Sequence, residues 1–353
     1  MVDEQVLQAL MALDGAPGDE RRVSAYLREQ LAPYADDFVY DNLGSIYAIK
    51  RAKTPNAPRV MVSGHMDEVG FVAKRFNDNG TIAGLALGEP LKASLLGSAV
   101  RFTLANGQTV MGTLLAHDTA GNAMTAKQDV LIDCGFASAK QAQQSGLQIG
   151  DRAVFAEALV HNAGSQRVIA KAFNGRYAPL MGIALLKAVA GEALPFDLYV
   201  GCTVQETVGL RGVQTATNAV QPDLGIVVDT DAAFDTQKDA QDRIGRLGDG
   251  VLLNFFDQTV LPNRLLLQTL KQVCEAQGLP YQYYYSLAGS DAAWINKLRT
   301  GTPTLFVNVA VRNMDTPQQV ADLGDLQSAQ QALIAFIQQL TPEQIAAFKA
   351  ENR

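Results

Sequence analysis

The segment RVMVSGHMDE (residues 59–68) decides how this chain of 353 residues is expected to fold. It starts as an apolar run and ends in a polar turn that contains His65 and Asp67. A buried strand that leads into such a turn is typical of parallel α/β sheets, in which binding sites lie at the carboxyl ends of the strands. A carboxylate two residues after a histidine can also orient the imidazole for metal binding. The segment therefore predicts a sheet strand with a functional site at its end.

Two later segments repeat this pattern. LYVGCTV (198–204) leads into Gln-Glu-Thr at 205–207, and LGIVV (224–228) leads into Asp229. Because the carboxyl ends of parallel strands meet at one edge of a sheet, we expect these polar residues to share a site with His65. Each of them, taken alone, is equally well explained as a hydrogen-bonded polar group at a strand end.

Helix and strand patterns alternate on both sides of a β-rich segment. Residues 3–33 predict two amphipathic helices, separated by a glycine- and proline-containing turn at 14–18. From about residue 70 to about 162 the segments are short, punctuated by glycine and rich in β patterns. Further elements are expected as helices at 180–190, 212–218, 261–277 and 326–340 and as strands at 197–204, 224–228 and 304–311. The prediction is an α/β domain formed by residues 1–69 and 163–353, with residues 70–162 inserted as a smaller β-barrel-like domain.

Composition excludes several classes of protein. Hydrophobic residues make up 48% of the chain, which is enough for a large core and argues against disorder. The net charge of −7, without a basic stripe, disfavours nucleic-acid binding, which depends on neutralising phosphates. No stretch reaches the roughly 18 consecutive apolar residues of a membrane span, and residues 1–15 lack the pattern of a signal peptide. Three widely spaced cysteines predict no disulfide framework. We therefore expect a cytoplasmic protein with neither nucleic acid nor membrane as a partner.

Two weaker features have more than one interpretation. The tyrosines in YQYYY (281–285) could form a platform for a carbohydrate or a peptide, and a half-buried strand explains them at least as well. The segment 288–294 could be a loop near the predicted site, or it could begin a helix that Ser290 or Asp291 caps.

Six motifs, in order and spacing, resemble the signatures of one family of two-metal exopeptidases. They are SGHMDEVGF (63–71), KAFNGRYAPLMGIALL (171–186), QETVGLRG (205–212), VVDTD (227–231), AGSDAAW (288–294) and RNMDTPQQV (312–320). The chain resembles, over essentially its whole length, the glutamyl aminopeptidase or tetrahedral aminopeptidase family, some of whose members are called endoglucanase-like. The resemblance implies a mixed-sheet, zinc-exopeptidase-type domain with helices on both faces.

The resemblance also assigns roles to residues of this chain. One metal of the family's centre would be held by His65 and Asp229, with Asp67 orienting the histidine. Glu206 occupies the position of the general base that takes a proton from the attacking water. These four positions keep the residue types that the family's chemistry requires.

Three other ligand positions depart from the family pattern. The bridging aspartate is replaced by Asn174, the glutamate after the general base by Thr207, and the late histidine by Asp315. A bridging ligand gives one oxygen to each of two dications and offsets their repulsion, whereas asparagine is neutral and has a single oxygen. The second metal position, with an amide, a hydroxyl and one carboxylate, lacks the ligands of a zinc site.

The resemblance and its departures lead to two functional hypotheses. The first is removal of N-terminal residues from short peptides, impaired or abolished by the three substitutions, with zinc or cobalt as the family's metal and at most one weakly held ion. The second is a non-catalytic homologue that binds peptides or supports an assembly. Relic hydrogen bonding among His65, Asp67, Glu206 and Asp229 would explain their persistence without metal. The resemblance also implies a homo-oligomer, in this family often a tetrahedral dodecamer.

Overall fold

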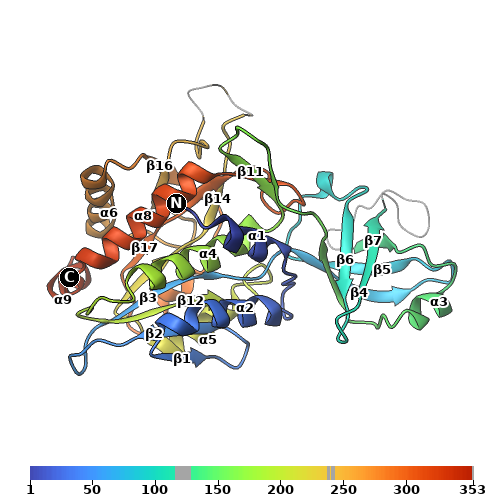
Figure 1. The fold of residues 1–353 in the computed structure, drawn as a ribbon, viewed down its shortest axis with the longest axis horizontal. Helices are drawn as coiled ribbons and strands as arrows, with labels where there is room; N and C mark the ends of the chain where they lie inside the picture. The colour runs from blue at the N-terminus through green and yellow to red at the C-terminus, as the bar shows by residue number, and fades with distance from the viewer. Residues whose placement is uncertain (116–128, 237–238, 240–242, 352–353) are drawn as a thin grey trace.

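A six-stranded mixed sheet forms the centre of the larger part of the molecule (Figure 1). The computed structural model describes residues 1–115, 129–236, 239 and 243–351. In spatial order the strands are β1 (Asp37–Tyr40), β2 (Ile46–Lys50), β12 (Asp197–Thr203), β3 (Arg59–His65), β13 (Leu224–Val227) and β17 (Thr304–Phe306). The last four run parallel, while β1 and β2 are antiparallel to their neighbours.

The strand register brings the predicted polar turns to one edge. Thr203 at the end of β12 is the partner of His65 at the end of β3, and Val227 of β13 is the partner of Ser63. The carboxyl ends of these three parallel strands therefore meet, as the sequence predicts.

Helices cover both faces of the sheet, which confirms the expected fold class. Buried apolar side chains of α5 (Arg211–Val220) and α7 (Ala292–Lys297) pack with one face of the sheet in a core of their own. The opposite face carries α1 (Glu4–Ala12), α2 (Arg21–Leu31), α4 (Phe173–Ala188), α6 (Arg264–Gln277), α8 (Leu323–Gln339) and α9 (Pro342–Ala350). Both cores consist mainly of Val, Ile, Leu and Ala, so burial of apolar area is the main force that holds the layers together.

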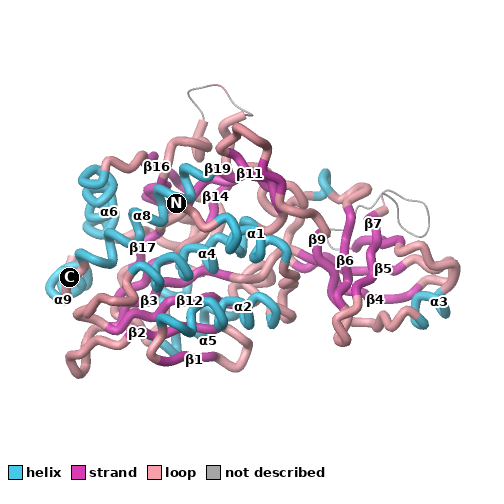
Figure 2. Tube along the Cα trace, in the orientation of Figure 1, coloured by secondary structure: helices cyan, strands magenta, loops and turns pink. Residues whose placement is uncertain are grey.

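A closed β-barrel projects from one end of the molecule (Figures 1 and 2). Its strands, in order around the barrel, are β4 (Gly70–Phe76), β5 (Ile82–Leu87), β8 (Asp129–Asp133), β7 (Thr109–Leu114), β6 (Ala99–Thr103) and β9 (Arg152–Phe155). The barrel has a separate hydrophobic core, in which Phe71 and Phe155 contact edge to face. The helix α3 (Ala139–Gln144) lies beside it. All six strands lie between Gly70 and Phe155.

Small sheets and short turns complete the described residues. The smaller sheets pair β10 (Val160–His161), β11 (Arg167–Ala170) and β19 (Gln319–Asp322); β14 (Thr230–Ala232) and β18 (Val309–Val311); and β15 (Val251–Phe256) and β16 (Tyr281–Tyr285). Two 3-10 turns span Ala32–Tyr34 and Lys92–Ser94. No helix among the described residues is both long and apolar enough to cross a membrane.

Three local predictions need correction. The strand expected at 304–311 is two strands in different sheets, because the chain leaves β17 before Asn308 and enters β18 after it. Neither Ser290 nor Asp291 caps α7 with its side chain; the Asp291 carboxylate accepts a hydrogen bond from Thr203 instead. The helix expected from residue 180 begins at Phe173, with a kink in its first turn. By contrast, the half-buried strand at 281–285 is confirmed, since Tyr284 is buried and its neighbours are not.

Candidate functional site

The turn after β3 is buried and is held by two cations, Arg176 of α4 and Lys171, which lies between β11 and α4. Glu68 is 2% exposed, and its carboxylate accepts hydrogen bonds from Lys171 Nζ at 2.9 and 3.0 Å and from Arg176 Nη2 at 2.7 Å. Arg176 also donates to the carbonyl oxygen of Met66. Burial lowers the pKa of Lys171, and the Glu68 charge opposes that shift. Two cations of the 171–186 segment therefore fix the backbone on either side of Asp67.

The same ion network reaches the barrel through Asp14. The Asp14 carboxylate accepts hydrogen bonds from Arg101 Nε at 3.0 Å and from the Thr103 hydroxyl, both on β6. Its Oδ1 lies 3.5 Å from Lys171 Nζ. The barrel, the loop after α1 and the turn after β3 are thus joined by one partly buried set of charges.

The kink at the start of α4 places Asn174 in the site. Asn174 and Gly175 depart from helical geometry, and Gly175 has φ +98°. A Cβ on Gly175 would lie 1.8 Å from the carbonyl oxygen of Asp67, so only glycine allows this approach. The kink turns the Asn174 side chain toward His65.

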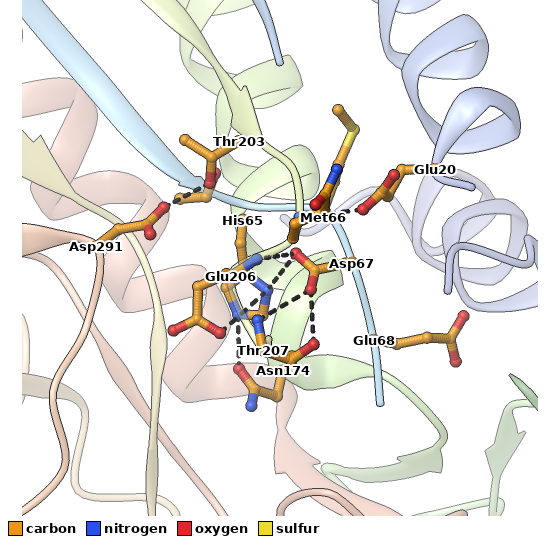
Figure 3. A network of polar contacts seen from close by, with 12 residues as sticks. Glu20, His65, Met66, Asp67, Glu68, Asn174, Thr203, Glu206, Thr207 and Asp291 are labelled. Carbon is orange, nitrogen blue, oxygen red and sulfur yellow. Dashed lines mark hydrogen bonds and ion pairs between the residues drawn. The ribbon is translucent and has the colours of Figure 1, made fainter. Parts of the chain in front are cut away.

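Asn174 joins His65 to Asp315 through both ends of its amide, and Figure 3 shows the His65 end of this link. His65 Nε2 lies 2.8 Å from Asn174 Oδ1, and Asn174 Nδ2 donates to Asp315 Oδ1 at 3.0 Å. An amide oxygen only accepts hydrogen bonds, so His65 Nε2 carries a proton and donates. The nitrogen that would face a metal is therefore occupied by a hydrogen bond.

Thr207 is also engaged in a hydrogen bond, to the Asp67 carboxylate. Asp67 Oδ2 accepts from the Thr207 hydroxyl at 2.8 Å and from the Thr207 amide at 3.0 Å, and Asp67 Oδ1 accepts from the Glu206 amide at 2.9 Å. Burial would raise the pKa of Asp67, but the nearby charge of His65, together with these donors, holds it below its usual value. Asp67 is therefore an ionised group inside the protein.

His65 is surrounded by three carboxylates, two of which, Asp67 and Glu206, are labelled in Figure 3. It is 1% exposed, and its ring nitrogens lie 3.5 Å from Asp67, 4.0 Å from Glu206 and 3.6 Å from Asp229. Burial alone would lower the pKa of His65, but Glu206, Asp229 and Asp67 raise it well above its usual value. His65 is thus an imidazolium, and its Nδ1 has no hydrogen-bond partner within the described parts of the chain.

The remaining acids of the site differ in their surroundings. Burial raises the pKa of Glu206 well above its usual value, against the opposing charge of His65. Asp229 Oδ1 accepts the Thr230 amide at 2.7 Å, and the Asp229 amide donates to Asn308 Oδ1 at 3.0 Å. Asp291 is fully buried, and burial raises the pKa of its carboxyl to about 7. The hydrogen bond from Thr203, the strand partner of His65, places Asp291 behind the site, as the loop interpretation of segment 288–294 predicts.

A cavity of about 610 Å³ opens beside this network. Its lining contains five of the seven residues that the sequence analysis singled out, namely Asn174, Glu206, Thr207, Asp229 and Asp315. The other two, His65 and Asp67, lie beneath it and contact four of those five by the hydrogen bonds and ion pairs described above, while Asp315 is joined to His65 through Asn174. The predicted residues therefore come together at one site.

Comparison with known proteins assigns the chain to a family. The model of the M42 glutamyl aminopeptidase family matches residues 44–332. The chain belongs to this family. It is 33% identical to the glutamyl aminopeptidase of Lactococcus lactis subsp. cremoris over 97% of this chain and 98% of the relative. The expected family is thereby confirmed.

Two solved structures show the same fold. The TET aminopeptidase from the marine sediment archaeon Thaumarchaeota archaeon SCGC AB-539-E09 has a TM-score of 0.89 and 30% identity, and the alignment covers 98% of this chain and 99% of that one. The TET1 peptidase of Pyrococcus horikoshii, which can assemble into a tetrahedron or a large octahedral shell, has a TM-score of 0.81 and 21% identity, with 96% and 99% covered. The second likeness concerns the fold alone.

M42 proteins are metal-dependent aminopeptidases, and the side chains present here do not fit a two-metal centre. The described residues contain no group of three or more His, Cys, Asp or Glu side chains placed to hold a metal ion. The amide of Asn174 gives its one oxygen to the proton of His65, and the Thr207 hydroxyl donates to Asp67. A metal would have to displace both hydrogen bonds and remove the His65 proton.

Proposed function

We propose that this M42 protein is a homologue that has lost two-metal peptide hydrolysis and keeps the cavity as a binding site. The observation that supports this most directly is the Asn174 amide, which bonds His65 at 2.8 Å and Asp315 at 3.0 Å. Each of the three substituted ligand positions takes part in the hydrogen-bond network instead of leaving an unpaired group. The His65 imidazolium supplies positive charge among the carboxylates.

The charge balance of the site supports the same proposal. Lone carboxylates at this depth are strongly destabilising unless a cation or hydrogen-bond donors accompany them. His65 contacts three acids, and the Asp67 carboxylate has three further donors from Glu206 and Thr207. Glu206 keeps the position of a general base. Without a metal to polarise the scissile carbonyl, however, a base alone supplies only a small part of the catalysis.

The test is metal analysis of protein purified without chelator, together with a peptidase assay. We expect less than one tightly bound transition metal per chain, and no hydrolysis of amino-acid p-nitroanilides after addition of zinc or cobalt. Two metal ions per chain, or turnover typical of an aminopeptidase, would refute the proposal.

The second candidate is residual hydrolysis with a single ion. His65 and Asp229 are the ligands that the family pattern retains, and their side chains lie 3.6 Å apart in the structure. A zinc or cobalt ion there would require deprotonation of His65, so activity from this route should depend on added metal and rise with pH. The same assay at increasing pH separates this candidate from the first.

The proposal extends to peptide binding and assembly. The cavity has the size of a site for a short peptide, and related TET1 peptidase can form closed shells. We propose that this chain also forms a homo-oligomer, with a tetrahedral dodecamer as the family's arrangement. Residues 70–162 would form the separate barrel domain that helps to bury subunit contacts. Light scattering that gives the mass of a single chain at micromolar concentration would refute the oligomer.

A further inference from the structure

The cavity beside His65 has a one-sided charge. Six carboxylic acids line it, namely Glu89, Glu206, Asp229, Asp231, Asp257 and Asp315. No lysine, arginine or histidine lines it within the described ranges. A concave, partly enclosed surface concentrates the field of such groups, so the cavity attracts positive charge and repels negative charge.

Among the residues that the structure describes, two of these acids have only neutral hydrogen-bond partners. Asp231 Oδ2 accepts hydrogen bonds from Asn254 Nδ2 and Asn308 Nδ2, each at 2.8 Å. Asp257 Oδ1 accepts from the amide and the hydroxyl of Thr259, at 2.8 and 2.6 Å. Neutral donors stabilise these carboxylates without offsetting their charge, in contrast to Glu206 and Asp229, which face His65.

A buried hydroxyl and an aromatic wall lie in the same lining. The Thr230 side chain is 5% exposed, and its Oγ1 has no hydrogen-bond partner among the described residues. A buried hydroxyl without a partner costs free energy that a ligand donor or acceptor would recover. Tyr284 and Tyr285 line the cavity with rings 6.4 Å apart. Aromatic faces attract ammonium groups.

We propose that the cavity binds a ligand with two primary ammonium groups, and that a ligand with an acidic side chain is excluded. One group would lie near the acids that contact the His65 and Asn174 pair, and the other near Asp231 and Asp257. The inference rests on the proposed function, because two bound dications would themselves offset the carboxylates. Peptides that begin with lysine and free diamines share this chemistry.

The experiment is isothermal titration calorimetry of the full-length protein with EDTA present. The probes are Lys-Ala, Glu-Ala and 1,5-diaminopentane, at 50 and 500 mM NaCl. We expect Lys-Ala to bind at least about tenfold more tightly than Glu-Ala, and to lose affinity at the higher salt because exposed charges are screened. If the diamine binds as tightly as Lys-Ala, free diamines are the source of the ligand; if Lys-Ala is tighter, peptides are. Equal or tighter binding of Glu-Ala, or no binding of either cationic probe, would overturn the inference.

A matched pair of variants locates the effect. In Asp257→Asn the amide oxygen can keep both Thr259 hydrogen bonds, and the amide nitrogen can donate to the Ser290 hydroxyl, which now lies 3.4 Å from Asp257 Oδ2. We expect about tenfold weaker binding of Lys-Ala. Asp78→Asn, on an exposed barrel turn, should leave binding unchanged, and an equal loss in both variants would contradict the proposed site. The probe comparison on the unaltered chain decides the matter if Asp257→Asn fails to fold.

Metal analysis of the same samples distinguishes a failure of the proposed ligand class from a failure of the proposed function. A metal-free protein that binds neither cationic probe refutes the ligand class and leaves the proposed function standing. A protein that carries two metal ions refutes the proposed function, whatever it binds.

Discussion

Replacing Asn174 by aspartate tests whether the site is adapted to the absence of metal. In the structure Asn174 Nδ2 donates to Asp315 Oδ1 at 3.0 Å, so Asn174→Asp replaces a donor by a second acceptor at that distance. The two carboxylates cannot both remain ionised there without strong repulsion. The bond to His65 Nε2 survives, because the new oxygen still accepts. The variant should therefore be less stable than the unaltered chain when no metal is present.

The size of the effect follows from the charges and the pH. Two unit charges 3.0 Å apart repel by about 5 kcal/mol at an effective dielectric constant of 20. One carboxyl of the pair can bind a proton instead, which costs about 1.4 kcal/mol for each pH unit above its ordinary pKa near 4. The loss of folding free energy is then about 5 kcal/mol at pH 8, where repulsion and protonation cost nearly the same, and about 1.5 kcal/mol at pH 5. Because the folded variant binds more protons than the unfolded chain, its stability falls as the pH rises through this window.

The assay is thermal unfolding with EDTA at both pH values. An unfolding entropy of about 2.1 cal/mol/K per residue converts these losses to decreases in Tm of about 7 °C at pH 8 and about 2 °C at pH 5. The control is the exchange Asn174→Asp with Asp315→Asn, which restores one amide and one carboxylate and should recover most of the stability. If Asn174→Asp is as stable as the unaltered chain at pH 8 without metal, the interpretation of the site as a hydrogen-bonded substitute for metal is wrong.

Three further predictions concern the site and its supports. The first is a triple substitution, Asn174→Asp with Thr207→Glu and Asp315→His. It completes the family's ligand pattern, so we expect a calorimetric titration to show zinc or cobalt binding. A metal concentration of 100 times Kd should stabilise the folded variant by about 2.7 kcal/mol. A folded variant that binds neither metal would disprove the assignment of these positions. The second concerns Glu20, whose pKa is raised to about 7 by burial and Asp67 and whose Oε1 accepts the Gly18 and Gln205 amides. Glu20→Gln keeps both hydrogen bonds, so its free energy of unfolding, measured in urea, should rise by about 2 kcal/mol relative to the unaltered chain between pH 5 and pH 8. A constant difference across that range would contradict this. The third is Lys171→Met, which should lower the free energy of unfolding by about 3–5 kcal/mol because the buried Glu68 carboxylate loses one of its cations. The control Lys74→Met, at an exposed ion pair, should cost less than about 1 kcal/mol. Similar costs for both variants in denaturant unfolding would argue against the buried network.

Local patterns in the sequence were sufficient to predict the sheet edge and the residues that meet there. Apolar runs before His65, Glu206 and Asp229 identify buried strands, and the general geometry of parallel sheets places their ends together. The β-rich texture likewise identified the barrel segment, because its short alternating strands differ from the helix patterns on either side.

The features that remained beyond prediction depend on contacts between distant segments. The kink that aims Asn174 at His65 exists because Gly175 packs against the Asp67 carbonyl, more than 100 positions earlier in the chain. Asp291 looks like a helix cap in sequence, and only its contact with Thr203 removes it from that role. The break between β17 and β18 occurs where Asn308 accepts the Asp229 amide, which no propensity of residues 304–311 reveals.

The short connection between β3 and β4 couples movements of the barrel to the candidate site. His65 ends one strand and Gly70 begins the first barrel strand, so the four residues between them, Asp67 included, bear any rotation of the barrel. Such a rotation would also separate the Asp14 carboxylate from Arg101 on the barrel or from Lys171. Because these charges are partly buried, their separation would cost free energy. If copies of this chain contact one another through the barrel, as proposed above, those contacts would also restrict the movement of this turn. The shape of the cavity would then depend on the assembly, and it would vary more in an isolated chain.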